Sequence, residues 1–205
     1  MSKKRLDPRI VRTRQLLRTA LLQLIHERGL EAVNVQDITE RATLNRATFY
    51  LHYTDKDDLL LQTLNDVLDE LTTLPMPVSP TNPSAPEPER IGAFFVGLFQ
   101  HVANNADFYR IMLGADSTAA YAARIQAYVE DIGLRWFARS VRHHNGTHLS
   151  VSPELMVSVL SGAYIGMIKW WLKNEVETSP EQMADQFLRL VLPGIIQVAT
   201  STPDT

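Results

Sequence analysis

The sequence of 205 residues contains no cysteine, which excludes disulfides and thiolate chemistry. It also has no segment typical of a secretory signal, because no apolar run of about 7–15 residues follows the charged start MSKKRLDPRIVRTRQ. Long hydrophobic runs are scarce. The longest apolar stretch, MVSVLSGAYIGMIKWWL, is broken by serines, small residues and Lys169, and it is too short and too polar to span a membrane comfortably. We therefore expect a cytoplasmic protein with no membrane partner.

Signatures of catalysis are also missing. The sequence has no nucleophile elbow, phosphate-binding loop, HExxH pair or convincing pair of catalytic carboxylates. His143, His144 and His148 lie close together, but in a loop without regular ligand spacing and without a neighbouring carboxylate or cysteine. Such histidines are expected to be solvated rather than bound to a metal. We therefore expect no enzyme activity, no metal and no cofactor.

The charge is unevenly distributed along the chain, although the formal net charge is only −3. Residues 1–54 contain ten Lys/Arg against five Asp/Glu, whereas residues 55–205 contain ten against eighteen. A basic end on an acidic body is typical of a protein that binds a polyanion through one end only. The alternative is chance clustering of solvated charges. Charge alone does not decide between them.

Apolar residues recur at helical spacing along most of the chain, and no strand pattern stands out. Gly29 is expected to stop the first helix, Asn34 to cap the second, and Ser-Pro pairs to open the last two. The sequence therefore predicts an all-α protein of about nine helices. After a first helix near residues 10–28, the expected ranges are 35–42, 46–52, 55–71, 89–104, 107–113, 116–142, 153–174 and 180–199.

A proline-rich stretch, LPMPVSPTNPSAPEPE, interrupts the helical pattern and divides the chain. We expect four parts, namely an N-terminal helical domain (1–54), a connecting helix (55–74), a Pro-rich loop (75–88) and a larger helical domain (89–205). Asp55 is the predicted N-cap of the connecting helix. Lys56, in its first turn, adds a positive charge where free backbone N–H groups already favour an anion.

Two short helices joined by a three-residue turn and braced by a longer first helix match the helix-turn-helix pattern. On a helical wheel of about 100° per residue, Arg46, Tyr50 and Tyr53 cluster on one side of the third helix, and Phe49 is available for packing. The alternative is that Phe49, Tyr50 and Tyr53 are only core aromatics of a helical hairpin.

The polar residues of this third helix suit recognition of double-stranded DNA. Arg46 can donate two hydrogen bonds to guanine, and Asn45 or Thr48 can meet other base edges in the major groove. The hydroxyl of Tyr50 and the ring of His52 suit phosphate oxygens, which position a protein on DNA without reading its sequence. The pattern therefore predicts a reading helix that begins at Asn45.

The segment VNVQDITERATLNRATFYLHYTDKDDLL resembles the DNA-binding domain of the tetracycline-repressor (TetR/AcrR) family. The pieces DI…RA, R-x-TFY-x-H-[FY] and DK-x-x-L occur in the family's order and spacing, and the resemblance covers about residues 9–71. It implies a homodimer of all-helical subunits, each with a three-helix DNA-binding domain and a larger domain for ligand binding and dimerisation. The family's DNA contacts carry over to Asn34, Gln36, Asn45, Arg46, Thr48, Tyr50, His52 and Lys56.

Two positions depart from the family pattern. Thr43 stands in the turn where the family usually has glycine, and a β-branched residue at positive φ costs roughly 1–2 kcal/mol. We therefore expect the turn to differ locally. Leu51 replaces a residue that is often polar or basic in the family, so we expect one backbone contact to be missing. Neither change removes the helix-turn-helix.

Aromatic residues recur at helical spacing after residue 89 and are typical of a core. Polar groups at the tips of some of them favour a second interpretation, because a mostly apolar cavity with a few polar groups is a typical small-molecule site. Such a site would suit an aromatic or otherwise hydrophobic effector. The candidate pocket residues are Phe95, Phe99, His101, Tyr109, Met112, Tyr121, Arg124, Tyr128 and Trp136.

The last two predicted helices favour dimerisation, because small residues allow close helix approach and tryptophans add apolar area. Alternatively, these helices pack only within the subunit. The pattern WWL-x-N…SPEQMA also resembles the C-terminal domain of one subgroup of these regulators. The candidate interface residues are Gly162, Ile165, Gly166, Lys169, Trp170, Leu188, Leu192 and Ile195.

These features together predict a ligand-responsive transcriptional regulator. We expect a repressor that binds a palindromic operator as a dimer and is released by a small hydrophobic or aromatic effector. The alternative is a DNA-binding adaptor whose C-terminal helices bind a protein partner instead of a small molecule.

Overall fold

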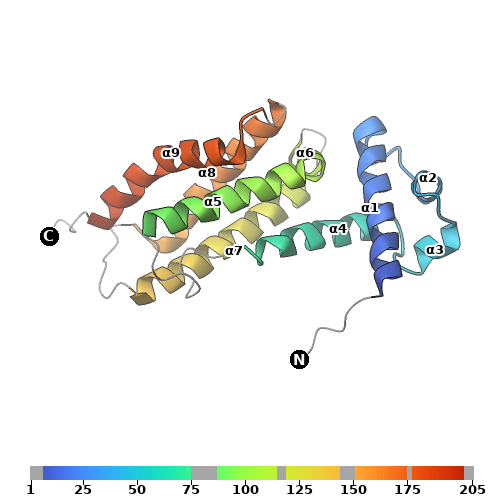
Figure 1. The fold of residues 1–205 in the computed structure, drawn as a ribbon, viewed down its shortest axis with the longest axis horizontal. Helices are drawn as coiled ribbons and strands as arrows, with labels where there is room; N and C mark the ends of the chain where they lie inside the picture. Colours follow the sequence, from blue (N-terminus) through green and yellow to red (C-terminus); the bar gives the residue numbers. More distant parts are fainter. Residues whose placement is uncertain (1–6, 75–86, 115–118, 144–150, 175–176, 201–205) are drawn as a thin grey trace. The chain divides into compact units, whose positions relative to one another are not determined.

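The computed structural model describes residues 7–74, 87–114, 119–143, 151–174 and 177–200 (Figure 1). In these segments the chain is helical without any strand, so the predicted all-α class is confirmed. The helices are α1 (Pro8–Arg28), α2 (Val35–Arg41), α3 (Arg46–Tyr50), α4 (Lys56–Leu71), α5 (Glu87–Asn104), α6 (Ala106–Leu113), α7 (Ala119–His143), α8 (Pro153–Lys173) and α9 (Pro180–Thr200).

Two predicted boundaries need correction. The third helix ends at Tyr50 rather than at residue 52, and α5 already begins at Glu87, inside the expected Pro-rich loop. The rest of that loop, residues 75–86, lies outside the described residues, as do His144, His148 and the side chain of His143.

The chain divides into two compact units, Met1–Val67 and Leu68–Thr205, called unit 1 and unit 2 below. Helix α4 is continuous from Lys56 to Leu71, so its first turns belong to unit 1 and its last turn to unit 2.

Unit 1 is a small helical domain built on α1. Asp7 caps α1 by accepting a hydrogen bond from Arg9 N, Pro8 occupies the first turn, and Gly29 ends the helix with φ 78°. One face of α1 is fully apolar and packs into the core of this unit. The buried residues of unit 1 include Leu17, Leu21, Leu24, Ile38, Phe49, Tyr53, Leu59, Leu60 and Leu64.

Unit 2 is a bundle in which α5 packs along α9 and α7 packs along α8 (Figure 1). An aromatic cluster fills its centre. The Phe99 ring lies edge-on to those of Tyr164 and Trp171, with centroids 5.1 and 5.6 Å away, and Phe187 adds a third ring at 6.2 Å. The indole N–H of Trp171 donates to Thr178 O at 2.9 Å. Each ring adds edge-to-face attraction to its buried area.

Helix α8 is, by length and composition alone, apolar enough to cross a membrane, contrary to the expectation from the sequence. About four tenths of its most apolar window, 39%, is buried inside the protein. Its inward face carries Tyr164, Ile168 and Trp171 against the aromatic cluster. The core helix of a soluble protein passes the same test of length and composition, so this feature is weak support for a membrane span.

Candidate nucleic-acid interface and apolar cavity

The start of α2 is held by a reciprocal capping box. Asn34 Oδ1 accepts from Asp37 N at 3.1 Å, and Asp37 Oδ2 accepts from Asn34 N at 2.9 Å. Arg28 pairs with the same carboxylate at 2.6 Å, and this hydrogen bond lowers the pKa of Asp37, with the Asn34 N–H acting in the same direction. Gln36 is exposed and donates to Glu40 at 2.8 Å. The helix is therefore preformed and presents Asn34 and Gln36 to solvent.

A second cap opens α3, the predicted reading helix. Asn45 Oδ1 accepts hydrogen bonds from Thr48 N at 2.7 Å and from Thr48 Oγ1 at 2.9 Å. The cap fixes the rotamers of both residues at the start of the helix. Asn45 and Thr48 are therefore held rigidly, with the Asn45 amide N–H₂ still a possible donor to a base edge.

The two faces of α3 separate cleanly. Phe49 is fully buried, whereas Tyr50 is 51% exposed and Leu51, just past the helix, is 80% exposed. Arg46 is exposed, and one of its guanidinium N–H groups lies 3.4 Å from the Tyr50 hydroxyl, a long hydrogen bond. The structure brings Arg46 and Tyr50 together on the outward side, as predicted.

Tyr53 does not share this side, which corrects the expectation from the helical wheel. Its side chain is only 5% exposed, and its ring lies 5.7 Å from the ring of Phe49. Burial raises the pKa of Tyr53. The wheel extends past Tyr50, where α3 ends, and Tyr53 lies in the turn between α3 and α4 with its N–H bonded to Phe49 O at 3.0 Å. His52 is half-buried beside Tyr53, with its ring centroid 6.2 Å away.

The turn between α2 and α3 places Thr43 in the left-handed region, although this residue is not a glycine. Thr43 has φ 55°. Its N–H donates to Glu40 O at 3.1 Å, and Leu44 N–H donates to Thr39 O at 2.9 Å. These two bonds form a Schellman motif, which requires a left-handed residue after the helix. Thr43 therefore adopts a strained conformation to satisfy the last carbonyls of α2.

Replacing Thr43 by glycine is expected to stabilise unit 1 by about 0.5–1 kcal/mol, because the relief of left-handed strain exceeds the extra chain entropy of glycine. Urea unfolding followed by circular dichroism measures this difference. Thr43→Ala is the matched control and should give no comparable gain, because alanine keeps a Cβ at positive φ. Equal gains for both variants would show that the strain has another source.

Lys56 lies in the first turn of α4 and is held inside unit 1. Its ammonium donates to Leu30 O and to Val33 O, both at 2.9 Å, and so ties α4 to the α1–α2 loop. The side chain is half-buried. Two of its three N–H donors are therefore used within the protein. We propose that Lys56 mainly positions the loop that carries Asn34, in addition to any phosphate contact.

Lys56→Met is expected to destabilise the protein by about 1–3 kcal/mol, since two loop carbonyls lose a charged donor. The exposed Lys173→Met serves as the control and should leave stability unchanged. If Lys56 only braces the loop, the slope of log affinity for DNA against log salt stays unchanged. A lost phosphate contact in each subunit of a dimer would instead flatten that slope by about 1.8.

The acidic residues that follow Lys56 close the start of α4. Asp55 Oδ1 accepts from Asp58 N at 2.8 Å, and Asp58 Oδ2 accepts from Thr54 N at 2.9 Å. The predicted N-cap is thus found together with a second bond, in which the Asp58 carboxylate reaches back to Thr54 N. A hydrogen bond from Gln62, followed by the Thr54 N–H, lowers the pKa of Asp58. Both carboxylates therefore stabilise the start of α4.

Unit 2 contains an apolar cavity of about 70 Å³. None of its lining residues carries a charge, and Leu71, the last residue of α4, is one of them. Two predicted pocket residues, Phe95 and Trp136, take part. The lining comprises Leu71, Phe94, Phe95, Leu98, Val129, Ile132, Gly133, Trp136, Val157, Leu160, Ser161, Tyr164 and Phe187.

The other seven predicted pocket residues do not line this cavity. Phe99 belongs to the aromatic cluster, and Met112 is buried elsewhere in the bundle. Tyr109 lies beside a separate groove with Lys169 and Lys173. The sequence analysis did not select Tyr164, which lines the cavity. Its hydroxyl within an apolar helix is the same feature by which the other tyrosines were selected. Three of the others lie on α7, namely Tyr121, Arg124 and Tyr128, and His101 lies on α5. None of these four residues lines the cavity.

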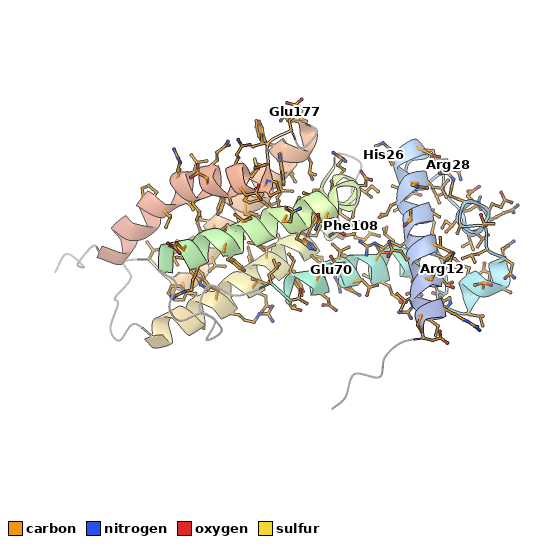
Figure 2. All side chains as sticks on the ribbon, in the orientation of Figure 1. Arg12, His26, Arg28, Glu70, Phe108 and Glu177 are labelled. Atoms are coloured by element: carbon orange, nitrogen blue, oxygen red, sulfur yellow. The ribbon has the colours of Figure 1, made fainter. Side chains whose placement is uncertain are left out.

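His101 and Tyr128 instead contact the last turn of α4. They belong to a group called the α4 clasp below, which comprises Asp69, Glu70, His101, Asn105 and Tyr128 (Figure 2 labels Glu70). His101 Nδ1 lies 3.5 Å from Glu70 Oε2, and Asn105 donates to the same oxygen at 3.2 Å. Tyr128 is hydrogen-bonded to Asp69. Burial, followed by the Asp69 charge, raises the pKa of Tyr128. The clasp attaches α4 to α5, α6 and α7.

The predicted interface residues divide into an outward and an inward set. Gly162 and Gly166 are exposed, with open space around an added Cβ, and Lys169 and Trp170 are exposed beside them. Ile165 is buried, whereas Leu188 and Leu192 are half-buried; the side chain of Ile195 lies outside the described residues.

Further exposed apolar residues extend this outward set. Leu155 and Val159 on α8 are 57% and 61% exposed, and Leu190 on α9 is 76% exposed. Leu155, Val159, Gly162, Gly166 and Trp170 follow one another at spacings of three and four, so they form one face of α8, called the α8 stripe below. Large exposed apolar faces of this kind are typical of protein interfaces.

Each of the two units matches a known protein family. Residues 17–63 match the family described as bacterial regulatory proteins, tetR family, and residues 89–192 match the TetR-type family described as transcriptional regulator C-terminal region. These are families of transcriptional regulators, not of enzymes. A curated relative, the uncharacterized HTH-type transcriptional regulator YxbF of Bacillus subtilis strain 168, is 25% identical over 193 residues, 92% of this chain. The chain spans about half, 47%, of the length of that relative.

Solved structures share the fold. A TetR-family transcriptional regulator from Syntrophomonas wolfei has a TM-score of 0.74 at 17% identity and covers 95% of this chain and 100% of its own. NalD of Pseudomonas aeruginosa, the secondary repressor of the MexAB-OprM multidrug efflux pump, has a TM-score of 0.66 at 20% identity, covering 90% and 96%. The dihydroxyacetone kinase operon activator DhaS has a TM-score of 0.67 at 15% identity, and the match covers 92% of this chain and 98% of DhaS. This chain therefore belongs to the TetR family of bacterial regulatory proteins.

Proposed function

We propose that this protein is a repressor that binds a palindromic operator as a homodimer and leaves it when a small apolar ligand occupies the cavity of unit 2. The observation that carries the proposal is the course of α4. Its last residue, Leu71, lines the cavity, and its first residue, Lys56, is bonded to the α1–α2 loop of unit 1. A ligand against Leu71 therefore touches the helix that begins in the DNA-binding unit.

The α4 clasp gives this coupling a mechanism. Asp69 and Glu70 are attached to three other helices of unit 2 immediately before Leu71. A ligand that displaces Leu71 must also strain or rearrange these hydrogen bonds, and the displacement continues along α4. The shift occurs only if the ligand binds the DNA-competent and DNA-free states with different affinity.

The DNA-bound state is proposed to use two copies of α3 in successive major grooves, about 34–36 Å apart. Arg46 would read guanine, Asn45 and Thr48 other base edges, and Tyr50 and His52 the phosphates. Asn34 and Gln36 would contact DNA from the start of α2. The α8 stripe and Leu190 would bury each other across the two-fold axis, which makes the interface isologous.

The direction of regulation is proposed to be repression. Proteins of this fold include the DhaS operon activator and the NalD repressor, so the fold leaves the direction open. Repression follows from the proposed release by a ligand, because a protein that leaves the operator when it binds its effector occupies the operator in the absence of that effector. A reporter driven by the operator should therefore be more active when the gene for this protein is deleted. Lower activity in the deletion strain would identify an activator.

Linkage provides the test of ligand control. A ligand selected by binding to the cavity is expected to weaken operator binding by about 5- to 150-fold, and saturating operator DNA should weaken ligand binding by the same factor. Fluorescence anisotropy with labelled operator measures the first quantity and isothermal titration calorimetry the second. A ligand that fills the cavity without changing operator affinity would instead favour an adaptor whose C-terminal helices bind a protein partner.

A further inference from the structure

The outward side of α3 carries two apolar side chains besides its polar ones. Ala47 and Leu51 are both exposed, Leu51 by 80%. Leu51 lies just past the last residue of the helix, but it keeps helical dihedral angles, φ −72° and ψ −18°, and its N–H donates to Ala47 O at 3.2 Å. The helical geometry of α3 therefore extends to Leu51.

The helical repeat places this pair opposite the core. Successive residues rotate by about 100°, so Ala47 and Leu51 each lie about 160° from Phe49 and about 40° from each other. Phe49 is fully buried in unit 1. The two apolar side chains therefore project from the side of α3 that faces away from its core contact. This pair, Ala47 and Leu51, is called the α3 crest below.

Polar residues flank the α3 crest on both sides. On one flank, an N–H group of Arg46 lies 3.4 Å from the Tyr50 hydroxyl, and the Tyr50 ring lies edge-on to the ring of Phe49 at a centroid distance of 5.4 Å. On the other flank, Thr48 is bonded to the capping side chain of Asn45. A helix that enters a groove with its buried side turned away presents its crest between these two polar flanks.

The chemistry of the major groove defines what such a crest can contact. Base edges there present hydrogen-bond donors and acceptors, and the thymine C5-methyl is the apolar group among them. Neither alanine nor leucine can bond to a base heteroatom or to a phosphate with its side chain. An apolar side chain placed on a polar base edge would leave that edge unpaired, whereas contact with a methyl group buries apolar surface on both partners. Thymine is therefore the base that fits the α3 crest.

We infer that the α3 crest reads the C5-methyl group of one thymine in each operator half-site. Arg46 and Leu51 are about 7.5 Å apart along the helix axis, which corresponds to roughly two steps of the DNA duplex. The thymine therefore lies within about three base pairs of the guanine that Arg46 contacts. The inference rests on the proposed function, because it adds a specificity-determining pair to operator recognition by α3.

Thymine and uracil differ only in this methyl group, so the test exchanges one base for the other. The probes are the operator duplex located by footprinting and the same duplex with deoxyuridine at every thymine. In anisotropy titrations the full chain should bind the thymine duplex roughly 10-fold more tightly, about 3- to 4-fold for each of two methyl groups. Uracil at single positions should locate the effect at one symmetry-related thymine per half-site. Equal affinity for the two duplexes would overturn the inference.

Leu51→Ala tests whether the crest itself reads the methyl group. The preference for thymine should fall to about 2- to 3-fold, with little change in affinity for the uracil duplex or for random DNA, because a side chain and a methyl group in contact have non-additive effects. Leu51 is 80% exposed, so the midpoint of urea unfolding should stay unchanged. If the variant keeps the full preference, the methyl group acts through DNA shape or another residue, and the inference is wrong.

Leu61→Ala is the matched control. Leu61 is also an exposed leucine of unit 1, at 40%, but it lies on α4. This variant should keep the full preference for thymine, and a loss equal to that of Leu51→Ala would show that the effect does not belong to the α3 crest.

The same titrations separate this inference from the proposed function. If the protein prefers its operator to random DNA but binds the thymine and uracil duplexes equally, operator recognition stands and the reading of thymine by the crest is wrong. If the protein binds operator and random DNA equally, the proposed function is wrong and the inference falls with it.

Discussion

Replacing Arg46 by alanine is expected to weaken operator binding by about 2–6 kcal/mol per dimer, or roughly 30- to 20,000-fold. A bidentate arginine–guanine contact contributes about 1–3 kcal/mol to base discrimination, and a dimer contains two copies. Arg46 is exposed and makes only a long hydrogen bond to Tyr50. Its removal should therefore change the free energy of unfolding by no more than about 0.5 kcal/mol. Anisotropy titrations on operator and on random DNA, together with urea unfolding, measure these quantities.

Arg46→Lys is the matched control for charge. Lysine keeps the positive charge but cannot reproduce the planar pair of donors, so most of the loss in operator affinity should remain while binding to random DNA recovers. If Arg46 contacts only phosphate, the lysine variant would restore operator affinity as well. An alanine variant with unchanged operator affinity would remove α3 from the reading surface altogether.

Replacing Trp170 by glutamate is expected to dissociate the dimer. Trp170 is 55% exposed and belongs to the α8 stripe, and an isologous interface contains it twice. Losing two aromatic anchors and burying two carboxylates should weaken dimerisation by at least about 4 kcal/mol, roughly 1,000-fold in Kd. Sedimentation velocity at micromolar concentration should then show a monomer. Operator affinity should fall in parallel, because a monomer reads only one half-site.

Leu134→Glu is the control for this substitution. Leu134 is also a partly exposed apolar residue of unit 2, at 37%, but it lies on α7 and is not part of the α8 stripe. The variant should remain dimeric. If the Trp170→Glu protein is still a dimer, the interface lies on another face. If the wild-type protein is a monomer, the proposed dimer is wrong.

The helices and the reading motif could be predicted because their signals are local. Gly29, Asn34, Asn45 and Asp55 mark helix ends by chemistry that acts within one turn, and each is found in that role. The outward position of Arg46 also follows from local periodicity. Where α3 ends, the same periodicity places Tyr53 on the wrong side.

Features that depend on tertiary packing could not be predicted in the same way. Thr43 is a local exception, because the Schellman bonds at the end of α2 hold it in the left-handed region against its intrinsic preference. Lys56 finds its carbonyl acceptors 23 and 26 residues away, at a site that no local pattern indicates. In unit 2, the polar groups of His101 and Tyr128 suggested a ligand pocket. The imidazole of His101 instead contacts Glu70, and the hydroxyl of Tyr128 is hydrogen-bonded to Asp69, both on α4.

The central claim is that two copies of α3, joined through a dimer, read a two-fold symmetric operator. Hydroxyl-radical footprinting on the DNA that flanks the gene for this protein tests it most directly. We predict two protected half-sites related by a palindrome, with centres about one helical turn of DNA apart or a multiple of it, and loss of both with Arg46→Ala. A single unpaired footprint, or protection that survives in the Arg46→Ala protein, would contradict the account.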